Sequence, residues 1–591
     1  MSAPNVNTLW GRAIVDEVAK SGVDAAVLSP GSRSTPLTVA FAEHPDIETF
    51  SHLDERSAAF FALGRAKRTG TPTPLVCTSG TALANYHPAV MEAGRARVPM
   101  LLLTADRPPE LDDSGANQTV DQADLYGDAV RHYRTLPEPE TADRKLRALR
   151  TAVSRGVATA TATNPGPVHL NVPFRKPLEP TVETDDVPEG WADDHALAAR
   201  GRDGPFVRTT QGRPTLTASD RAAVVRALNG ADRGLIFCGP ADRPTPDRDA
   251  LLGLAKATGF PVLADPLSGI RFGDHTEEVT VLGGYDAWAP ALRTRLPTPD
   301  VVLRFGASPT SKRTRKALAD TTLSMEADAP RQFLVDPAGG WREAEFTATD
   351  TLVADPTHLA SALAGRVERD GDGFADLLAD VEADYRSLVA AEDRFFEGQV
   401  LADAAALAPD PATLFVSNSM PVRDLDRFAE PRAADITALG NRGASGIDGI
   451  TSTALGAGSA TDDPLVLVTG DLAYYHDTNG LLAVGRFGLD ATIVLINNDG
   501  GGIFHLLPIE AHDTFEGYFR TPHGLDFSPT GDLYGLAFAR TTTREGFREA
   551  YTASVEREGT QVIEVGFDSA ESHAVREELQ ERVAAELDAT L

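Results

Sequence analysis

Two short apolar segments near the carboxyl end of the chain constrain its fold and its chemistry more than any other feature. Both are rich in β-branched residues, and they end in oxygen-bearing side chains beside glycine, at Gly470-Asp471 and at residues 497–500 (NNDG). A helix-length stretch separates them, so we expect both ends at one edge of a parallel sheet. A carboxylate, an amide oxygen and a glycine carbonyl that converge there suit Mg²⁺ and leave places for phosphate oxygens. The alternative is a doubly wound sheet whose loops simply happen to be rich in Gly, Asp and Asn.

Strand-like and helix-like segments alternate along nearly the whole chain, a pattern that predicts an α/β fold with parallel sheets. Its 591 residues exceed what one hydrophobic core usually organises. We therefore expect three tandem doubly wound parallel-sheet domains, over residues 1–178, 214–366 and 367–591. Residues 179–213 have no sustained periodicity and are rich in acidic residues, proline and glycine, which is typical of a linker.

The chain is strongly acidic, with 55 basic and 86 acidic residues and a formal net charge of −31. Such a surface repels nucleic acid and anionic lipid, so neither is an expected partner. Only seven of the basic residues are lysines. An acid-rich, lysine-poor composition favours a halophilic protein in a cytosol of very high salt, where self-repulsion is screened. An acidic protein from a GC-rich genome is the alternative.

The apolar runs are far shorter than the roughly 20 residues that span a bilayer. The first 22 residues lack a basic region followed by an apolar block, and they predict a capped amphipathic helix instead. We therefore expect a cytoplasmic protein without membrane insertion. Cys77 and Cys238 lie far apart in apolar strand-like segments, so a disulfide framework is not expected.

Four motifs follow predicted strands of the first domain: SPGSRSTPLT (29–38), HLDER (52–56), CTSGTALAN (77–85) and TADRPPELDDSGANQ (104–118). A lone glutamate that opens a helix, such as Glu55, is usually a solvated residue favoured by the helix dipole. Open α/β sheets, however, bind their ligands at the carboxyl ends of the strands. The four motifs together therefore favour a binding site that includes Glu55.

The three-domain organisation, the paired Gly-Asp and Asn-Asn segments and the glutamate-bearing loop resemble the thiamine-diphosphate enzymes, and the likeness covers essentially the whole chain. Seven motifs are similar to those of one family, the synthases that make 2-succinyl-5-enolpyruvyl-6-hydroxy-3-cyclohexene-1-carboxylate (SEPHCHC) in menaquinone biosynthesis: SPGSRSTPLT, HLDER, TSGT, LTADRPPELDDSGANQ, SNSMPVRD, NRGASGIDG and NNDGGGIF. The resemblance implies a thiamine-diphosphate-binding fold. It makes 1–178 the pyrimidine-binding domain, 214–366 the central α/β domain and 367–591 the diphosphate- and metal-binding domain.

The resemblance also implies which residues hold the cofactor, thiamine diphosphate with Mg²⁺ or Mn²⁺. The implied metal ligands are Asp471, Asn498 and the backbone carbonyl of Gly500. Glu55 of the neighbouring subunit is the implied catalytic residue, because it would hydrogen-bond N1′ of the aminopyrimidine ring and favour its imino tautomer. The other implied cofactor contacts are apolar, and ordinary core packing is their alternative: Ile447, Ile503 and Phe504.

The substrates implied by the resemblance, 2-oxoglutarate and isochorismate, bring four carboxylates between them, so the site would be cationic inside an anionic protein. Arginine suits this role because its planar fork binds carboxylates bidentately. For Lys312 and Arg313, a solvated helix face in the run SKRTRK is the alternative. The substrate-binding positions that match the family are Ser32, Arg33, Arg107, Asn117, Gln118, Lys312, Arg313, Ser419, Arg423 and Arg442.

The implied activity is that of a transferase. The enzyme would decarboxylate 2-oxoglutarate and add the succinyl-semialdehyde carbanion in conjugate fashion to isochorismate, working as a homodimer or a dimer of dimers. An acetolactate-synthase-like enzyme or a 2-oxoacid decarboxylase is one alternative, disfavoured by the arginine-rich motifs. A non-catalytic relative is the other, disfavoured by the joint presence of Glu55, Asp471 and Asn498. The triple glycine at 500–502 departs from relatives with a polar third residue, which puts a side-chain role at 502 in doubt.

Overall fold

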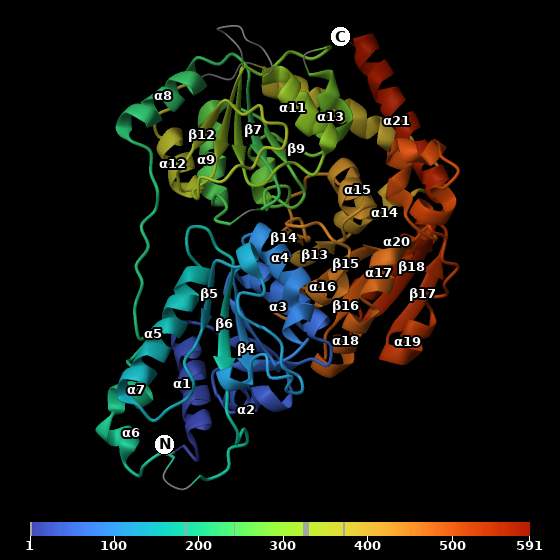
Figure 1. Ribbon diagram of the computed structural model, residues 1–591. Coiled ribbons are helices and arrows are strands. Elements are labelled where there is room, and N and C mark those ends of the chain that lie inside the picture. Colours follow the sequence, from blue (N-terminus) through green and yellow to red (C-terminus); the bar gives the residue numbers. More distant parts are fainter. Residues whose placement is uncertain are drawn as a thin grey trace. The chain divides into compact units, whose positions relative to one another are not determined.

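Three six-stranded sheets, each flanked by helices, organise the chain in the computed structural model (Figure 1). The structure describes residues 3–183, 186–241, 243–292, 294–322, 330–369 and 373–590. All paired strands within these sheets are parallel. The expectation of three α/β units with parallel sheets is confirmed.

The chain divides into two compact units. Unit 1 contains residues up to Gln211 together with Asn441–Asp462 and His476–Leu489. Unit 2 contains Gly212–Gly440, Asp463–Tyr475 and the residues from Asp490 onward. The second and third sheets thus share one unit, while two segments between strands of the third sheet belong to the unit of the first sheet.

The sheet of unit 1 has the strand order β2-β1-β3-β4-β6-β5. Its four inner strands are buried along their whole length, as expected for parallel strands covered on both faces. The strands are β1 (Ala25–Ser29), β2 (Glu48–Ser51), β3 (Thr73–Cys77), β4 (Met100–Asp106), β5 (His132–Thr135) and β6 (Pro167–Pro173). The helices of this unit are α1 (Val6–Lys20), α2 (Thr35–Ala42), α3 (Glu55–Thr69), α4 (His87–Arg95), α5 (Asp143–Ala160), α6 (Trp191–Asp194), α7 (Ala196–Arg200), α16 (Ile450–Gly458) and α18 (Leu482–Phe487).

Helices α3 and α16 of unit 1 approach each other backbone to backbone. A Cβ atom at Gly64 of α3 would lie 1.9 Å from the carbonyl oxygen of Thr453. One at Gly456 of α16 would lie 2.0 Å from the carbonyl oxygen of Phe61. Only glycine fits at either position, so this helix pair depends on both residues.

The second sheet, in unit 2, has the order β12-β11-β10-β7-β8-β9. Its strands are β7 (Gly234–Cys238), β8 (Val262–Ala264), β9 (Val281–Leu282), β10 (Val301–Phe305), β11 (Arg331–Val335) and β12 (Asp350–Leu352). The helices of this part are α8 (Ala218–Asn229), α9 (Arg248–Thr258), α10 (Tyr285–Trp288), α11 (Lys312–Thr322), α12 (Pro356–Ala364) and α13 (Phe374–Ala390).

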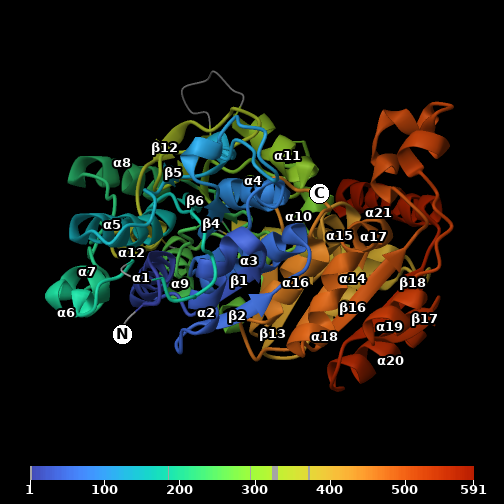
Figure 2. The ribbon, with the colours of Figure 1, turned by 60° about the horizontal axis from the view of Figure 1, so that its bottom comes forward.

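The third sheet, also in unit 2, has the order β14-β13-β15-β16-β18-β17, and Figure 2 shows its strands in orange and red. Its strands are β13 (Ala412–Val416), β14 (Ile436–Leu439), β15 (Leu465–Gly470), β16 (Ala491–Asn497), β17 (Ala537–Thr541) and β18 (Gln561–Gly566). The helices here are α14 (Glu397–Ala406), α15 (Met420–Phe428), α17 (Asp471–His476), α19 (Pro529–Tyr534), α20 (Arg544–Val555) and α21 (Ser569–Thr590).

Buried contacts join the second and third sheet regions within unit 2. The guanidinium of Arg271 donates to Asp426 Oδ1 of α15 at 2.9 Å, and the hydroxyl of Tyr285 donates to the same oxygen at 2.8 Å. Val583 of α21 also shares an apolar core with Leu378 of α13. These buried polar and apolar contacts tie the two regions together.

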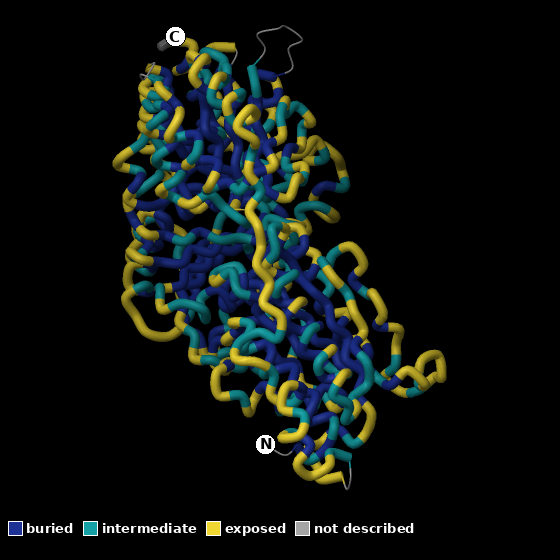
Figure 3. The backbone as a smooth tube through the Cα atoms, turned by 90° about the vertical axis from the view of Figure 1, so that its left-hand side faces the viewer, coloured by how far each residue is buried: buried dark blue, intermediate teal, exposed yellow. Residues whose placement is uncertain are grey.

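The segment expected to be a linker, 179–213, differs from that expectation in its middle. Residues 191–200 form α6 and α7, and Trp191 and Ala198 are buried in the core of unit 1. The guanidinium of Arg150 binds the carbonyl of Ala198 at 2.9 Å, which ties α7 to α5. Residues 207–213 are exposed and have no helix or strand. Figure 3 shows exposed residues in yellow, with the buried residues, in dark blue, lying further inside.

Candidate functional site

The carboxyl ends of β15 and β16 bring Asp471 and Asn498 together in unit 2. The two strands pair up to Gly470 and Ile496, so the residues that follow them leave the sheet side by side. Asp471 Oδ2 accepts hydrogen bonds from the backbone amides of Asn498 at 3.2 Å and of Gly500 at 2.9 Å. Asp471 and Asn498, 27 positions apart in sequence, therefore lie together with Gly500 at one edge of the sheet. We call this group of three residues the oxygen-rich edge.

The side-chain amide of Asn498 has a hydrogen-bond partner at its nitrogen and none at its oxygen among the described residues. Its Nδ2 donates to Glu397 Oε1 at 2.8 Å, so its Oδ1 must point the other way. That oxygen is buried and has no hydrogen-bond partner among the described residues. A buried acceptor without a partner is costly unless a ligand satisfies it, and an amide oxygen is a ligand that Mg²⁺ and similar hard cations prefer.

The carboxyl group of Asp471 is almost fully buried, and burial raises its pKa above the ordinary value. Hydrogen bonds from the backbone amides of Gly500 and Leu472 act in the opposite direction. A cation beside this carboxylate would favour its charged form in the same way. Within the described ranges, no group of three His, Cys, Asp or Glu side chains could hold a metal alone. A cation here would therefore also need backbone and cofactor oxygens.

The three glycines after Asn498 leave no room for side chains. Gly500 has φ of 144°, and a Cβ atom there would lie 2.1 Å from the carbonyl oxygen of Arg520. A Cβ atom at Gly502 would lie 2.7 Å from Asn498 Nδ2. The glycine at 502 thus gives the amide of Asn498 the space it occupies.

His523, which the sequence did not single out, lies against the same carboxylate. Its Nε2 is 3.2 Å from Asp471 Oδ2, and its backbone amide donates to Asp499 Oδ1 at 2.9 Å. The residue comes from the segment 512–527, which lies between β16 and α19 and outside the motifs. Nothing in the spacing of the motifs connects it with Asp471, so only the structure reveals the contact.

Ile503 and Phe504 follow the glycines in a short 3₁₀ segment and are both half-buried. The ring of Phe504 meets that of Phe519 edge to face, with centroids 5.5 Å apart. The two predicted apolar contacts therefore lie directly after the oxygen-rich edge, where they can form an apolar wall beside it.

A pocket of about 340 Å³ in unit 2 brings together three predicted substrate residues, Lys312, Arg313 and Arg423. Burial lowers the pKa of Arg313 below its ordinary value. Arg423 donates to the carbonyl of Ser419 at 2.5 Å, and Ser419 has a positive φ of 71°. Five further basic or imidazole side chains line the pocket: Lys316, Arg427, His505, His573 and Arg576. Four acidic side chains line it too: Asp286, Asp424, Asp426 and Glu577. The six lysines and arginines outnumber them, and this excess suits anionic groups such as carboxylates.

Arg576 of α21 links this pocket with the oxygen-rich edge. Its guanidinium donates to Asp424 Oδ1 at 2.8 Å and to Glu397 Oε2 at 2.5 Å. Asp424 is the neighbour of Arg423 on α15, and Glu397 orients Asn498. Arg576 and Glu397 lie outside the motifs, so the sequence alone did not point to either residue.

Arg33 and Arg107 are two cationic side chains that lie near each other in unit 1. Arg33 is 5% exposed and donates to the carbonyl of Phe174 at 2.6 Å. Burial lowers its pKa, and the nearby charge of Arg107 lowers that pKa further. Arg107 Nε donates to the carbonyl of Gln118 at 3.3 Å, and Gln118 Nε2 in turn donates to the carbonyl of Ser79 at 2.9 Å.

The other predicted residues of unit 1 lie at the ends of its elements. Ser32 and Asn117 are exposed beside Arg33 and Gln118. Glu55 is the first residue of α3, follows the capping residue Asp54 and is half-buried. Arg442 and Ile447 lie in the segment that leads into α16, and both are half-buried.

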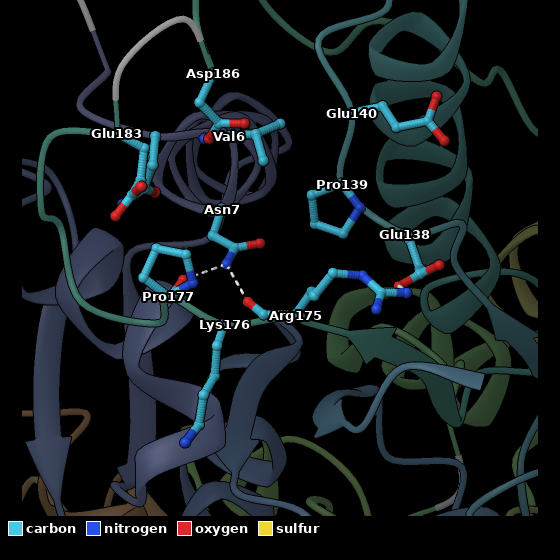
Figure 4. A pocket seen from close by; sticks show the side chains of 11 residues that line it. Val6, Asn7, Glu138, Pro139, Glu140, Arg175, Lys176, Pro177, Glu183 and Asp186 are labelled. Atoms are coloured by element: carbon cyan, nitrogen blue, oxygen red, sulfur yellow. Dashed lines mark hydrogen bonds and ion pairs between the residues drawn. The ribbon is translucent and has the colours of Figure 1, made fainter. Parts of the chain in front are cut away.

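A cavity of about 520 Å³ at the beginning of α1 contains none of the predicted residues (Figure 4). Asn7 Nδ2 donates to the carbonyls of Arg175 and Pro177, both at 2.6 Å. Arg175 also pairs with Glu138 at 2.7 Å. These contacts fasten the start of α1 to the segment after β6, which indicates a structural role.

Three family models match the chain. Residues 10–125 match the N-terminal TPP binding domain of thiamine pyrophosphate enzymes, 202–416 match the model described as the middle domain of thiamine pyrophosphate, and 434–565 match the C-terminal TPP binding domain. Proteins named SEPHCHC synthase are close relatives. Those of Natronomonas pharaonis and Haloarcula marismortui are 65% and 62% identical, each over 99% of this chain and the whole of the relative. One from Roseiflexus sp. is 44% identical over 96% of both chains.

The three parallel sheets and the matched models define a thiamine-diphosphate enzyme. More narrowly, the identity to relatives over nearly the full length is decisive: the chain belongs to the family of 2-succinyl-5-enolpyruvyl-6-hydroxy-3-cyclohexene-1-carboxylate synthases. None of the helices in the described part of the chain has the length and apolar character needed to cross a membrane.

Proposed function

We propose that this enzyme decarboxylates 2-oxoglutarate and adds the remaining succinyl-semialdehyde unit in conjugate fashion to isochorismate, which gives SEPHCHC for menaquinone biosynthesis. Membership of the family supports the reaction, and the cationic pocket of unit 2 supports dicarboxylic substrates. The observation that carries the proposal is the buried, unpartnered Oδ1 of Asn498 beside Asp471. An amide oxygen next to a carboxylate can bind a metal ion that also holds a diphosphate.

The metal site consists of Asp471, Asn498 and the carbonyl of Gly500, with Mg²⁺ or Mn²⁺ as the ion. Asp471 supplies the charge, and Asn498 supplies the oxygen that Glu397 aims by holding the opposite end of the amide. Ile503 and Phe504 form the apolar wall beside the cofactor. The domains that serve these roles are the pyrimidine-binding domain over 1–178, the central domain over 214–366 and the diphosphate-binding domain over 367–591, with 179–213 between the first two.

Thiamine diphosphate, when bound, supplies the nucleophilic carbon that takes up the 2-oxoacid and stabilises the negative charge left by loss of carbon dioxide. Glu55 holds a proton at N1′ of the pyrimidine and thereby promotes deprotonation of that carbon. In this proposal Glu55 reaches the cofactor from a second subunit, so the active form is a homodimer or a dimer of dimers. Ile447 would support the cofactor through an apolar contact.

Each unit carries side chains that we assign to the substrate carboxylates. Lys312, Arg313 and Arg423 line the unit 2 pocket, and the carbonyl of Ser419 orients Arg423. The unit 1 positions that complete the set are Ser32, Arg33, Arg107, Asn117, Gln118 and Arg442. Arginine forks fix the orientation of a carboxylate as well as its charge. The enzyme acts in the cytoplasm on small molecules, without nucleic acid or membrane insertion.

Turnover of 2-oxoglutarate with thiamine diphosphate and Mg²⁺, with and without isochorismate, tests the proposed function. The proposal predicts carbon dioxide release that rises strongly when isochorismate is added, and consumption of both acids in equal amounts. Release that is independent of isochorismate would identify a simple 2-oxoacid decarboxylase. No release under either condition would reject the proposed reaction.

A further inference from the structure

Glu92 of α4 is a buried carboxylate that binds three consecutive backbone amides of another segment of unit 1. Its Oε1 accepts from the amide of Gly443 at 2.8 Å. Its Oε2 accepts from the amides of Ala444 at 2.6 Å and of Ser445 at 3.3 Å. The side chain is 3% exposed. One carboxylate therefore accepts hydrogen bonds from three backbone amides. Without it, these amides would be buried without an acceptor or bonded to water.

The segment held by Glu92 lies directly on α4. A Cβ atom at Gly443 would lie 2.4 Å from the carbonyl oxygen of Glu92 and 2.8 Å from the amide nitrogen of Ala96, so glycine permits the approach. Lys67 of α3 lies 3.4 Å from Glu92 Oε1, with its side chain nearly buried. The carboxylate thus connects α3, which begins at Glu55, with α4 and with residues 443–445.

A second group of contacts fixes the backbone on both sides of residues 443–445. Asn441 Nδ2 donates to the hydroxyl of Thr453 at 3.0 Å, and that hydroxyl donates to the carbonyl of Gly449 at 2.6 Å. Arg442 lies between Asn441 and Gly443, and Ile447 lies between Ser445 and Gly449. To these two residues we assign a substrate carboxylate and the cofactor. Their positions are set by the backbone that Glu92 holds.

We propose that Glu92 is a positioning residue that places Arg442 and Ile447 for substrate and cofactor, a role that rests on the proposed function of those two residues. A charged acceptor is needed because each oxygen faces only donors, from the backbone and from Lys67. A glutamine would turn an N–H group toward one of these donors and release part of the segment. A charge-assisted hydrogen bond contributes about twice as much as a neutral one.

Glu92→Gln tests this role, with Glu17→Gln as the matched control and Glu92→Asp as the conservative variant. Glu17 is fully buried in unit 1, accepts from the amide of Phe206 and pairs with Arg150, and it touches no predicted site residue. Four quantities are compared: thermal stability, hydrogen exchange of amides 443–445, affinity for thiamine diphosphate with Mg²⁺, and KM for each acid with kcat.

For Glu92→Gln we expect faster exchange of these amides and a rise of roughly tenfold in cofactor Kd or in KM for one acid, the effect of about one lost charge-assisted hydrogen bond. Glu92→Asp recovers part of that loss. Glu17→Gln lowers stability to a similar degree but keeps cofactor Kd and both KM values within about twofold of the parent, since the contacts it weakens are those to Arg150 and Phe206 and not those to residues 443–445.

Unchanged exchange at 443–445 in Glu92→Gln would overturn the inference, as would Kd and KM values equal to those of Glu17→Gln. If the parent enzyme does not turn over the two acids, the proposed function fails separately. Hydrogen exchange and cofactor affinity then still decide whether Glu92 positions this segment.

Discussion

The carboxylate of Glu397 accepts a hydrogen bond from the side-chain nitrogen of Asn498 at 2.8 Å, and this contact determines where the amide oxygen points. Glu397 is itself held by Arg576, which also binds Asp424 of α15. The orientation of a candidate metal ligand is therefore coupled to the helix that carries Arg423. Outer contacts of this kind often tune a metal site nearly as strongly as the ligands themselves.

Asp471→Ala is expected to abolish tight binding of thiamine diphosphate in the presence of Mg²⁺. Loss of the anionic ligand should lower the affinity by more than about 100-fold, beyond the 10–100-fold typical of outer partners. Calorimetric titration measures this change. Asp265→Ala is the control, because Asp265 is an equally buried carboxylate after β8 that accepts from the amides of Leu267 and Thr310. Equal affinities in the two variants would exclude Asp471 as a ligand.

Glu397→Gln should leave the ligands in place but let the amide of Asn498 rotate. We expect the affinity for Mg²⁺ and thiamine diphosphate to fall by about 10–100-fold, as for other outer partners. Titration of the apoenzyme with the metal at fixed cofactor measures the effect. A variant that binds the metal as tightly as the parent would show that the orientation of Asn498 does not matter.

Arg423→Ala is expected to raise KM for one acid substrate and to leave cofactor affinity unchanged. The lost charge-assisted contact is worth about 1.5–3 kcal/mol, or roughly 10–150-fold in KM. Arg432→Ala serves as the control, because Arg432 donates to the carbonyls of Ala405 and Ala408 and does not line the pocket. Steady-state kinetics with each acid varied in turn distinguishes the two variants. If Arg423→Ala kept both KM values and kcat, the cationic pocket would lose its assigned role.

Asp477 predicts a pH-dependent stability. It is fully buried, and burial raises its pKa to about 6, although the amide and hydroxyl of Ser452 donate to it. Folding favours the protonated form of a group whose pKa is raised. The stabilisation that protonated Asp477 gives the folded state is therefore fully present below about pH 4 and is lost as the pH rises through 6. The loss is on the order of 3 kcal/mol relative to Asp477→Asn, which does not titrate. Denaturant unfolding of both proteins at several pH values tests this, and a constant difference would contradict it.

The charge of −31 predicts that assembly needs salt. At low ionic strength the subunits of the proposed homodimer should repel each other, so the assembly should loosen and activity should fall. Molar KCl shortens the Debye length to about 3 Å and should restore both together. Sedimentation and activity across a KCl series measure the effect. A compact, active dimer at about 50 mM KCl would reject the halophilic interpretation while leaving the catalytic proposal intact.

The inner strands and most helices could be predicted from sequence, but several edge strands could not. The strands β5, β9, β12 and β17 all lie at the edges of their sheets and have mixed burial. Because one side of an edge strand faces solvent, it lacks the continuous apolar run that identifies β1 or β16. The sequence also could not predict that α16 belongs to unit 1, since this depends on close contacts at Gly64 and Gly456.

In the candidate site, too, residues next to a local sequence signal could be predicted, whereas residues that depend on long-range contacts could not. Asp471 and Asn498 were predicted because each directly follows a strand, and parallel strands align their ends. His523, Glu397 and Arg576 were missed because their contacts join segments more than 50 positions apart, without a local motif. Glu92 was missed for a similar reason, because a buried glutamate within a helix carries no signal until its amide partners are known.

Mass spectrometry of the product formed from both acids tests the central claim most directly. With thiamine diphosphate and Mg²⁺, the account predicts one product whose mass equals isochorismate plus 2-oxoglutarate minus carbon dioxide, and Glu55→Gln should form it about 10²–10⁴-fold more slowly. Carbon-13 in the four retained carbons of 2-oxoglutarate should appear in that product. Unlabelled isochorismate together with free succinate semialdehyde would contradict the account.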